Sequence, residues 1–246
     1  MNGAKGLPLL KVPMENVDEL EIKKFEALAA RWWDPNSEFK PLHEINPLRM
    51  NYISQKLNLA GKTVVDIGCG GGILAEAMAH HGATVTAIDL ADASLAVAKL
   101  HQLESKLAIN YRKISAEQLA AAEPGKYDVV TCLEMLEHVP APAAVVQACH
   151  DLVKPGGTIF FSTINRKPKS YVFAILGAEY ILKLLPRGTH DYGRFIKPSE
   201  LAAWCRDAQL QLQDQKGMGY NLLTKKYSMQ QNLDVNYIAT YSRAER

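Results

Sequence analysis

Short apolar runs and longer amphipathic stretches alternate along the middle of the chain. Apolar runs at residues 64–67, 83–88, 127–132 and 158–163 predict strands, and the β-branched run 64–67 is typical of a strand buried on both faces of a sheet. Residues 109–112, Ile-Asn-Tyr-Arg, predict a further strand between the second and the fourth. Amphipathic stretches with helical spacing follow three of them, at residues 73–80, 93–105 and 143–152. This alternation predicts an α/β fold with a parallel, doubly wound sheet whose ligand sites lie at the carboxyl ends of the strands.

The N-terminal part of the chain predicts helices that pack on this sheet. Asn16 or Asp18 can cap a helix that runs to about Trp32, with Leu20 on its packed side. Two adjacent tryptophans, Trp32 and Trp33, end this helix. Anchoring in the core is favoured for them over stacking on a ligand.

Further elements complete the predicted domain. Residues 39–49 are rich in turn formers and lead into a helix at about 48–57, and the tail offers a helix at 199–207 and strand-like runs near 210–215 and 236–241. The predicted sheet therefore has seven strands, mostly parallel, with helices on both faces. Residues 1–14 predict a mobile N-terminus and residues 15–246 a single domain, with N-terminal helices over 15–58 and an inserted helical segment, a lid or a membrane contact, over 166–197.

Composition excludes several classes of protein. With 246 residues, 48% of them hydrophobic, the chain has ample material for one large core, and its net charge of +2 is too small to demand a nucleic acid as partner. Its four cysteines lack Cys-x-x-Cys spacing, which is typical of reduced thiols in a cytosolic protein. We find neither a signal peptide nor an apolar run long enough to span a membrane.

A glycine-rich turn after the first strand predicts a cofactor site. Gly68 and Gly70 follow Asp66 directly, and Asp89 closes the second strand 21 residues after Gly68. An acidic side chain in that place can accept hydrogen bonds from both hydroxyls of a ribose. An NAD motif needs a third glycine, but Ile73 stands there. Asp66 would also repel a pyrophosphate and attract the cationic groups of S-adenosylmethionine.

These motifs resemble those of the class I S-adenosylmethionine-dependent methyltransferases. The resemblance covers roughly residues 60–165, through the glycine turn, Asp89, Tyr127-Asp128-Val129-Val130 and Leu152-Val-Lys-Pro155-Gly156-Gly157. It implies S-adenosylmethionine as the cofactor. A glycine turn in an α/β fold without a ligand is the less favoured reading.

A closer resemblance runs almost from end to end of the chain. The segments beginning at Phe39, Glu134, Gly177 and Gly188 are similar to those of the ubiquinone-biosynthesis O-methyltransferases. This resemblance implies methylation of two ring hydroxyls of polyprenylated phenol and catechol intermediates, with other ubiquinone-biosynthesis proteins as further partners. It also implies cofactor contacts, at Arg49, Gly68, Asp89 and Leu133.

Two devices could remove the proton of the acceptor hydroxyl. One is a general base, for which His138, His190 and His43 are candidates, with Glu137 beside His138. The other is a magnesium ion that binds a catechol and lowers the pKa of its hydroxyl. Glu134, Glu137 and His138 follow the fourth strand, where helical spacing could direct all three to one ion. A polar helix start without a metal explains these residues equally well.

Two rival functions share the same fold. Methyltransferases of exocyclic amines in nucleic acids carry an Asn/Asp-Pro-Pro-aromatic run after the fourth strand, where this chain has Thr131-Cys132-Leu133-Glu134. A nucleotide sensor without catalysis is the other rival, because fold does not imply function. Binding of S-adenosylmethionine against NAD, followed by turnover with a catechol, separates these functions.

The inserted segment predicts contact with a membrane. Residues 166–194 carry six basic and two acidic side chains around the apolar stretch 171–185. A basic-flanked apolar helix can lie in the interface of an anionic bilayer, although a lid over the active site is the alternative. We therefore expect a cytoplasmic protein that associates peripherally with the inner face of the membrane.

Overall fold

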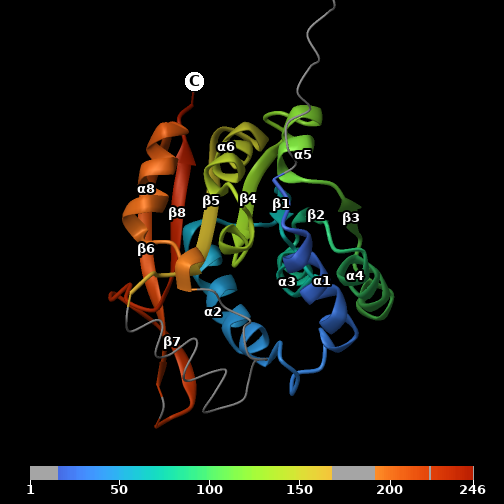
Figure 1. Cartoon of the computed structure of the whole chain (residues 1–246). Helices are drawn as coiled ribbons and strands as arrows, with labels where there is room; N and C mark the ends of the chain where they lie inside the picture. The colour runs from blue at the N-terminus through green and yellow to red at the C-terminus, as the bar shows by residue number, and fades with distance from the viewer. Residues whose placement is uncertain (1–15, 168–191, 222, 246) are drawn as a thin grey trace, which may run out of the picture.

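The computed structural model describes residues 16–167, 192–221 and 223–245. The predicted lead-in 1–14 and the predicted apolar helix 171–185 lie outside the described residues. The described chain forms one sheet with strand order β3-β2-β1-β4-β5-β8-β6-β7 (Figure 1). An α/β fold with a mostly parallel sheet is therefore confirmed.

Five parallel strands form the part of the sheet that carries the predicted cofactor motif. They are β1 (Thr63–Ile67), β2 (Thr84–Asp89), β3 (Ile109–Lys113), β4 (Tyr127–Leu133) and β5 (Val153–Ile164). Four of them match the predicted ranges to within one residue, whereas β5 begins before its predicted range of 158–163. β1 and β4 are apolar runs buried on both faces of the sheet, but β3 has exposed residues at Asn110 and Lys113. Asp66, Asp89 and Leu133 consequently lie at or near the carboxyl ends of neighbouring strands.

Three antiparallel strands extend the sheet beyond β5. β8 (Asn236–Arg243) pairs with β5, β6 (Leu210–Asn221) pairs with β8, and β7 (Lys226–Gln230) pairs with the end of β6. The predicted count of seven strands was therefore wrong, since the sheet has eight. β7 was missed because its sequence, Lys-Tyr-Ser-Met-Gln, is mainly polar and none of its residues is fully buried.

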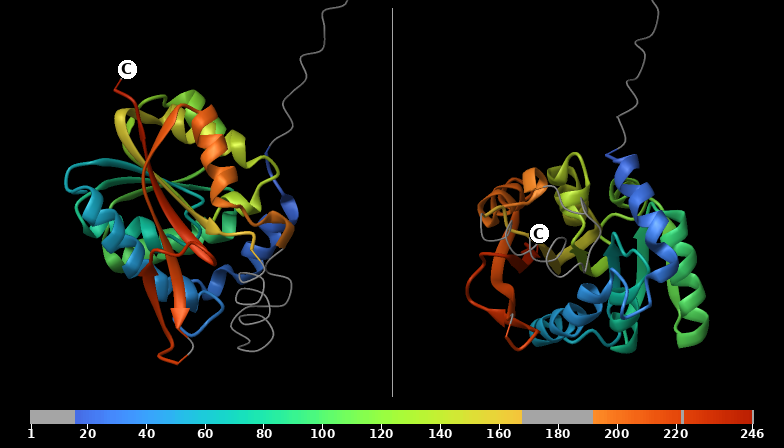
Figure 2. Two further views of the ribbon diagram at one scale, coloured as in Figure 1. Left: turned by 90° about the vertical axis from the view of Figure 1, so that its left-hand side faces the viewer. Right: turned by 60° about the horizontal axis from the view of Figure 1, so that its bottom comes forward.

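Helices cover both faces of the sheet, as predicted (Figure 2). One face carries α2 (Lys40–Lys56), α3 (Ile73–His80) and α4 (Asp92–Ser105), and the other carries α5 (Ala116–Ala122), α6 (Pro142–Leu152) and α8 (Pro198–Asp207). Each layer has its own apolar cluster, with Val64 and Phe160 in the first and Val65 and Phe161 in the second. Alternate residues of one strand thus serve opposite cores.

The helices before β1 differ in detail from the prediction. Asp18 caps α1 (Glu19–Leu28) by accepting from two backbone N–H groups, but Leu20 is 71% exposed rather than packed. α2 begins at Lys40, so the stretch 39–49 was wrongly predicted as turns. Pro41 is tolerated because it lies in the first helical turn, where no N–H donor is needed. The internal Pro47 removes one backbone hydrogen bond of the helix, and burial of Ile45 offsets part of that cost.

All four cysteines are buried and free. Among the residues that the structure describes, no helix has the length and apolar character needed to cross a membrane.

Candidate active site

The turn after β1 holds its backbone against the end of β2. Asp89 accepts hydrogen bonds from the N–H of Gly70 at 2.8 Å and of Ala91 at 2.9 Å. Gly68 and Gly70 have φ values of 71° and 51°, a region that L side chains rarely adopt. The Asp89 carboxylate therefore fixes the glycine turn, and burial raises its pKa. A ribose placed here would meet a carboxylate that already has fixed geometry.

Two tryptophans from the N-terminal segment pack on the same turn. A Cβ atom at Gly70 would lie 2.1 Å from Cζ2 of Trp32, so the indole occupies the space that glycine leaves. Trp33 donates from Nε1 to the carbonyl of Gly71 at 2.9 Å and stacks on His101 with ring centroids 3.4 Å apart. The predicted anchoring is confirmed for Trp32, which is 5% exposed.

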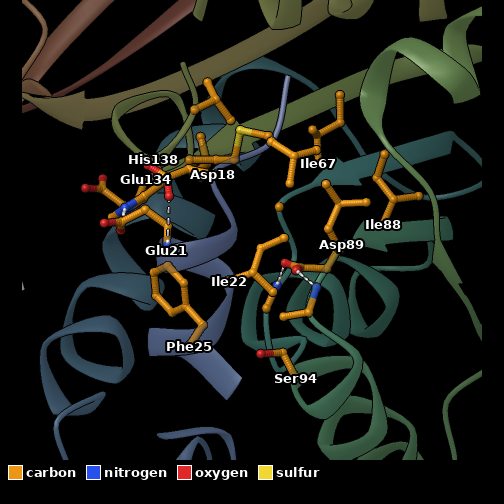
Figure 3. Close-up of a pocket in the computed structure, with 18 of the residues that line it drawn as sticks. Asp18, Glu21, Ile22, Phe25, Ile67, Ile88, Asp89, Ser94, Glu134 and His138 are labelled. Carbon is orange, nitrogen blue, oxygen red and sulfur yellow. Dashed lines mark hydrogen bonds and ion pairs between the residues drawn. The ribbon is translucent and has the colours of Figure 1, made fainter. Parts of the chain in front are cut away.

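A cavity of about 250 Å³ opens beside this turn, and α1 forms its roof. Figure 3 shows Ile22 of α1 beside Asp89 of the sheet, and Phe25 of α1 beside Glu21 and His138. The carboxyl ends of β1, β2 and β4 form the floor, with Gly68, Gly70, Asp89 and Leu133 among the lining residues. Four of the predicted cofactor contacts thus surround one cavity. The sequence did not predict that α1 covers this cavity, because an amphipathic pattern indicates that a helix packs on the domain but not which site it covers.

Asp66 lies behind the cavity wall and does not line it. Its side chain is 3% exposed and accepts from the hydroxyl of Thr131 at 2.7 Å. Burial raises the pKa of Asp66 to about 7, and the nearby Asp89 carboxylate acts in the same direction. A cationic ligand in the cavity would favour the ionised form of Asp66.

Arg49 also lies outside the cavity lining, where it pairs with Glu134. Its guanidinium donates to Oε1 of Glu134 at 2.7 Å, while its Nε is buried without a hydrogen-bond partner. Glu134 also accepts from Ser162 and Asn236, and its φ of 54° is unusual for a residue other than glycine. Glu134, which directly follows β4, thus gathers three donor side chains at the cavity wall. An orphaned Nε of this kind suits a ligand carboxylate.

Glu137 is buried beneath the segment that follows β4. It accepts from the hydroxyl of Thr163 at 2.8 Å and is 5% exposed. Burial raises the pKa of Glu137 to about 7, and the Glu134 carboxylate adds to this shift. Glu137 does not line the cavity.

His138 lines the cavity and contacts its roof. Its Nδ1 lies 2.8 Å from Oε2 of Glu21, and the ring of Phe25 packs edge-on against it. Burial lowers the pKa of His138, but the bond to Glu21 and the carboxylates of Glu137 and Glu134 outweigh burial and raise it. The same bond lowers the pKa of Glu21 to about 2.

The three residues predicted to hold magnesium have separate partners. Glu134 binds Arg49, Glu137 binds Thr163, and His138 binds Glu21. Within the described ranges, no group of three His, Cys, Asp or Glu side chains is arranged to hold a metal ion. In this arrangement the residues do not fit a shared ion. The magnesium site stays a prediction, which turnover in the presence of a chelator would test.

Of the other two histidine candidates, His43 does not line the cavity. His43 contacts the carbonyl of Trp32 through Nε2 at 2.9 Å, which is a structural role. His190 lies outside the described residues. Ser115 caps α5 in a reciprocal arrangement with Gln118, and it also lines the cavity.

Comparison with protein families gives a match over most of the chain. A family model described as a methyltransferase domain matches residues 42–215. The match includes the glycine turn, Asp89 and the segment after β4. It begins after α1, so the roof of the cavity lies outside the matched residues.

Individual relatives match more of the chain. A Pseudomonas paraeruginosa protein named ubiquinone biosynthesis O-methyltransferase is 65% identical over 230 residues, which is 94% of this chain and 99% of the relative. A protein of the same name from Pseudomonas syringae pv. tomato is 66% identical over 225 residues, 92% of this chain and 97% of the relative.

A solved structure has the same fold at low sequence identity. Magnesium protoporphyrin IX methyltransferase from Synechocystis PCC 6803, with bound SAH, aligns with a TM-score of 0.68 and 19% identity, over 90% of this chain and 95% of the other. At this identity the likeness shows the fold alone.

Proposed function

Because the chain belongs to the family of ubiquinone biosynthesis O-methyltransferases, we propose that it methylates ring hydroxyls of polyprenylated phenol and catechol intermediates in ubiquinone biosynthesis. S-adenosylmethionine is the methyl donor, and both O-methylation steps of the pathway are within its scope. The observation that carries the proposal is a single cavity that joins Asp89, Gly68 and His138. A ribose acceptor, the glycine turn and a base candidate thereby face the same space.

The cofactor would be held by residues at three strand ends. Asp89 accepts from the ribose hydroxyls, and the glycine turn lets the backbone approach the ligand. Arg49, with its unpartnered Nε, is placed to meet the methionine carboxylate if it exchanges its bond to Glu134. When bound, S-adenosylmethionine supplies an electrophilic methyl group.

The chain itself must remove a phenol proton and exclude water. We assign proton removal to Nε2 of His138, because Nδ1 is held by Glu21 and the ring lines the cavity. Glu137 is buried away from the cavity and acts on His138 through its charge. The roof shields the reaction, since Phe25 of α1 and Trp32, which follows α1, present apolar surface to the cavity.

Product analysis tests the function. The enzyme is incubated with S-adenosylmethionine and a catechol that carries a short prenyl tail, and the product is examined by mass spectrometry. We expect one added methyl group on oxygen, and loss of turnover in His138→Asn with cofactor binding retained. Equal turnover of catechols with and without the tail would favour the alternative, another small phenolic substrate. Absence of any methylated phenol would overturn the proposal.

We further propose that the protein works on the cytoplasmic face of an anionic membrane, where a polyprenyl tail stays in the bilayer. The inserted segment 166–194 was predicted to dock there through its basic flanks. Three of those flanking residues are described, and each pairs with a carboxylate: Arg166 with Glu200, Lys167 with Asp234, and Arg194 with Asp18. Their charge is therefore largely neutralised within the protein.

Membrane docking of the segment can be tested with the remaining basic groups. Flotation with anionic and with neutral liposomes should show preferential binding to the anionic ones, and Lys169→Glu, Lys183→Glu and Arg187→Glu together should abolish it. Lys167→Glu serves as a matched comparison, because that lysine is paired with Asp234 at 2.6 Å. Equal association with both lipids would contradict docking.

A further inference from the structure

The hairpin of β6 and β7 projects from the edge of the sheet that carries the cavity. β6 and β5 are both antiparallel to β8, so β6 runs parallel to β5 and ends at the same edge as β1 to β5. Pairing of β6 with β8 stops at Met218, while pairing with β7 continues to Asn221 (Figure 1). The tip of the hairpin therefore extends beyond the sheet on the cavity side.

The described part of the tip exposes a leucine on an ordered turn. Leu223 is 94% exposed, more than the other exposed large apolar side chains of the described chain. Oδ1 of Asn221 accepts from the N–H of Leu223 at 2.9 Å and of Thr224 at 3.1 Å. These bonds fix the turn that presents the leucine to solvent. A single exposed leucine is ordinary on a protein surface, so the side chains around it decide which partner it can meet.

Basic and aromatic side chains flank this leucine. Lys225 and Lys226 follow within three residues, and among the described residues neither forms an ion pair. At the base of the turn, the rings of Tyr220 and Tyr227 pack across the hairpin with centroids 4.8 Å apart. An apolar tip, adjacent lysines and a tyrosine belt match the depth profile of an anionic bilayer, from acyl chains to headgroups.

We propose that the tip of the β6–β7 hairpin, through its described residues 221 and 223–226, inserts into the interface of an anionic lipid bilayer. Insertion there would turn the cavity edge of the sheet toward the membrane, because the hairpin extends from that edge. This inference rests on the proposed action on a membrane-held polyprenyl substrate, and it assigns the contact to a different segment from 166–194. The hairpin and that segment can be tested independently.

Vesicle binding of two charge variants with equal net charge tests the electrostatic part. Lys225→Glu with Lys226→Glu should weaken binding to phosphatidylglycerol-containing vesicles by roughly 30-fold or more. The matched control is Lys62→Glu with Lys106→Glu, two exposed lysines that precede β1 and β3 at the opposite edge of the sheet. The control should bind like the parent protein. Equal weakening in both variants would overturn the proposal.

A fluorescent probe tests insertion of the tip itself. The native cysteines are all buried, so a cysteine introduced by Leu223→Cys can be labelled selectively with an environment-sensitive dye. Anionic vesicles should shift its emission to the blue. Leu103→Cys is the control, because Leu103 is 73% exposed near the end of α4, at the opposite edge. No shift at position 223, or the same shift at both positions, would overturn the proposal.

The outcomes separate this inference from the proposed function. A hairpin variant that binds vesicles like the parent would refute the hairpin contact and leave the enzymatic proposal intact. Both hairpin variants should keep full turnover of a short-tailed, water-soluble catechol, since Leu223, Lys225 and Lys226 are not among the described residues that line the cavity. Absence of that turnover in the parent protein would instead overturn the proposed function.

Discussion

Nδ1 of His138 lies 2.8 Å from the carboxylate of Glu21, and this contact ties the roof of the cavity to the segment after β4. Both side chains are mostly buried, with 20% and 12% of their surfaces exposed. Asp18 and Arg194 form a second ion pair at the N-terminus of α1, at 2.7 Å. The helix that covers the cavity is thus held by charges as well as by Phe25 packing. Its position should depend on pH.

The first prediction concerns the stability that this pair supplies. The pKa of Glu21 falls from 4.5 to about 2, so its contribution is present above pH 4.5 and is lost as the pH falls toward 2. The pKa of His138 is raised from 6.5, so its contribution is present below pH 6.5 and is lost as the pH rises through the folded value.

Glu21→Gln should therefore destabilise the protein most between pH 4.5 and 6.5, by about 1–3 kcal/mol. Urea unfolding of both proteins across this range measures the difference. Lys24→Gln is a control, because it removes only the 51% exposed partner of Glu21. A difference in stability that does not vary with pH would contradict the prediction.

The second prediction is that Asp89 holds the cofactor. Asp89→Ala removes an acceptor for the ribose and also releases the N–H groups of Gly70 and Ala91. A hydrogen bond to a charged acceptor contributes about 1.5–3 kcal/mol, so S-adenosylmethionine should bind roughly ten- to a hundredfold more weakly. Calorimetry on the folded variant measures this. Asp89→Asn keeps one oxygen acceptor, so its affinity for S-adenosylmethionine should fall less. Unchanged affinity in Asp89→Ala would refute the assignment of Asp89 to the cofactor.

The third prediction concerns the charge of Asp66. Because its pKa is raised to about 7, half of the ligand-free protein carries a neutral Asp66 near that pH. The fixed positive charge of S-adenosylmethionine favours the carboxylate, so affinity should fall by up to about tenfold per pH unit below 7. Titration calorimetry between pH 5.5 and 8.5 tests this. In Asp66→Asn the affinity for S-adenosylmethionine should vary less with pH. An equally steep variation in that variant would mean that another group causes the pH dependence.

The local sequence pattern predicted most of the parallel strands because they contain contiguous apolar runs, although β3 is mainly polar. The pattern located Asp66, Gly68 and Asp89 because they belong to one local motif of strand, glycine turn, helix and strand. It failed where the information is tertiary. The pairing of Glu21 with His138 joins residues 117 positions apart, and neither spacing nor periodicity encodes such a contact. β7 is stabilised by pairing with β6 rather than by its own apolar residues.

The segment after β4 illustrates the same limit. Helical spacing suggested that Glu134, Glu137 and His138 share one face. The chain instead forms a short 3-10 turn over Leu136–His138, and Glu134 takes a positive φ. The three side chains therefore diverge toward partners on α2, β5 and α1. Backbone strain at Glu134 depends on Arg49, Ser162 and Asn236, which are far away in the sequence.

The last prediction separates two reasons why glycine stands at position 70. Gly70 has a φ of 51°, and a Cβ there would lie 2.1 Å from the Trp32 ring. Gly61 has a φ of 74°, but nothing lies within 4 Å of its would-be Cβ. Gly61→Ala therefore measures left-handed strain alone, about 1–2 kcal/mol. Gly70→Ala adds a clash with a buried indole.

We expect Gly70→Ala to lower the free energy of unfolding by clearly more than Gly61→Ala, and to weaken S-adenosylmethionine binding while Gly61→Ala leaves it unchanged. Adding Trp32→Leu to Gly70→Ala should recover part of the stability, because the smaller side chain leaves room for the new methyl group. Thermal unfolding and calorimetry on the parent, the three single variants Gly61→Ala, Gly70→Ala and Trp32→Leu, and the double variant measure both effects. Additive losses in the double variant would show that the ring and position 70 do not interact, and that strain alone requires the glycine.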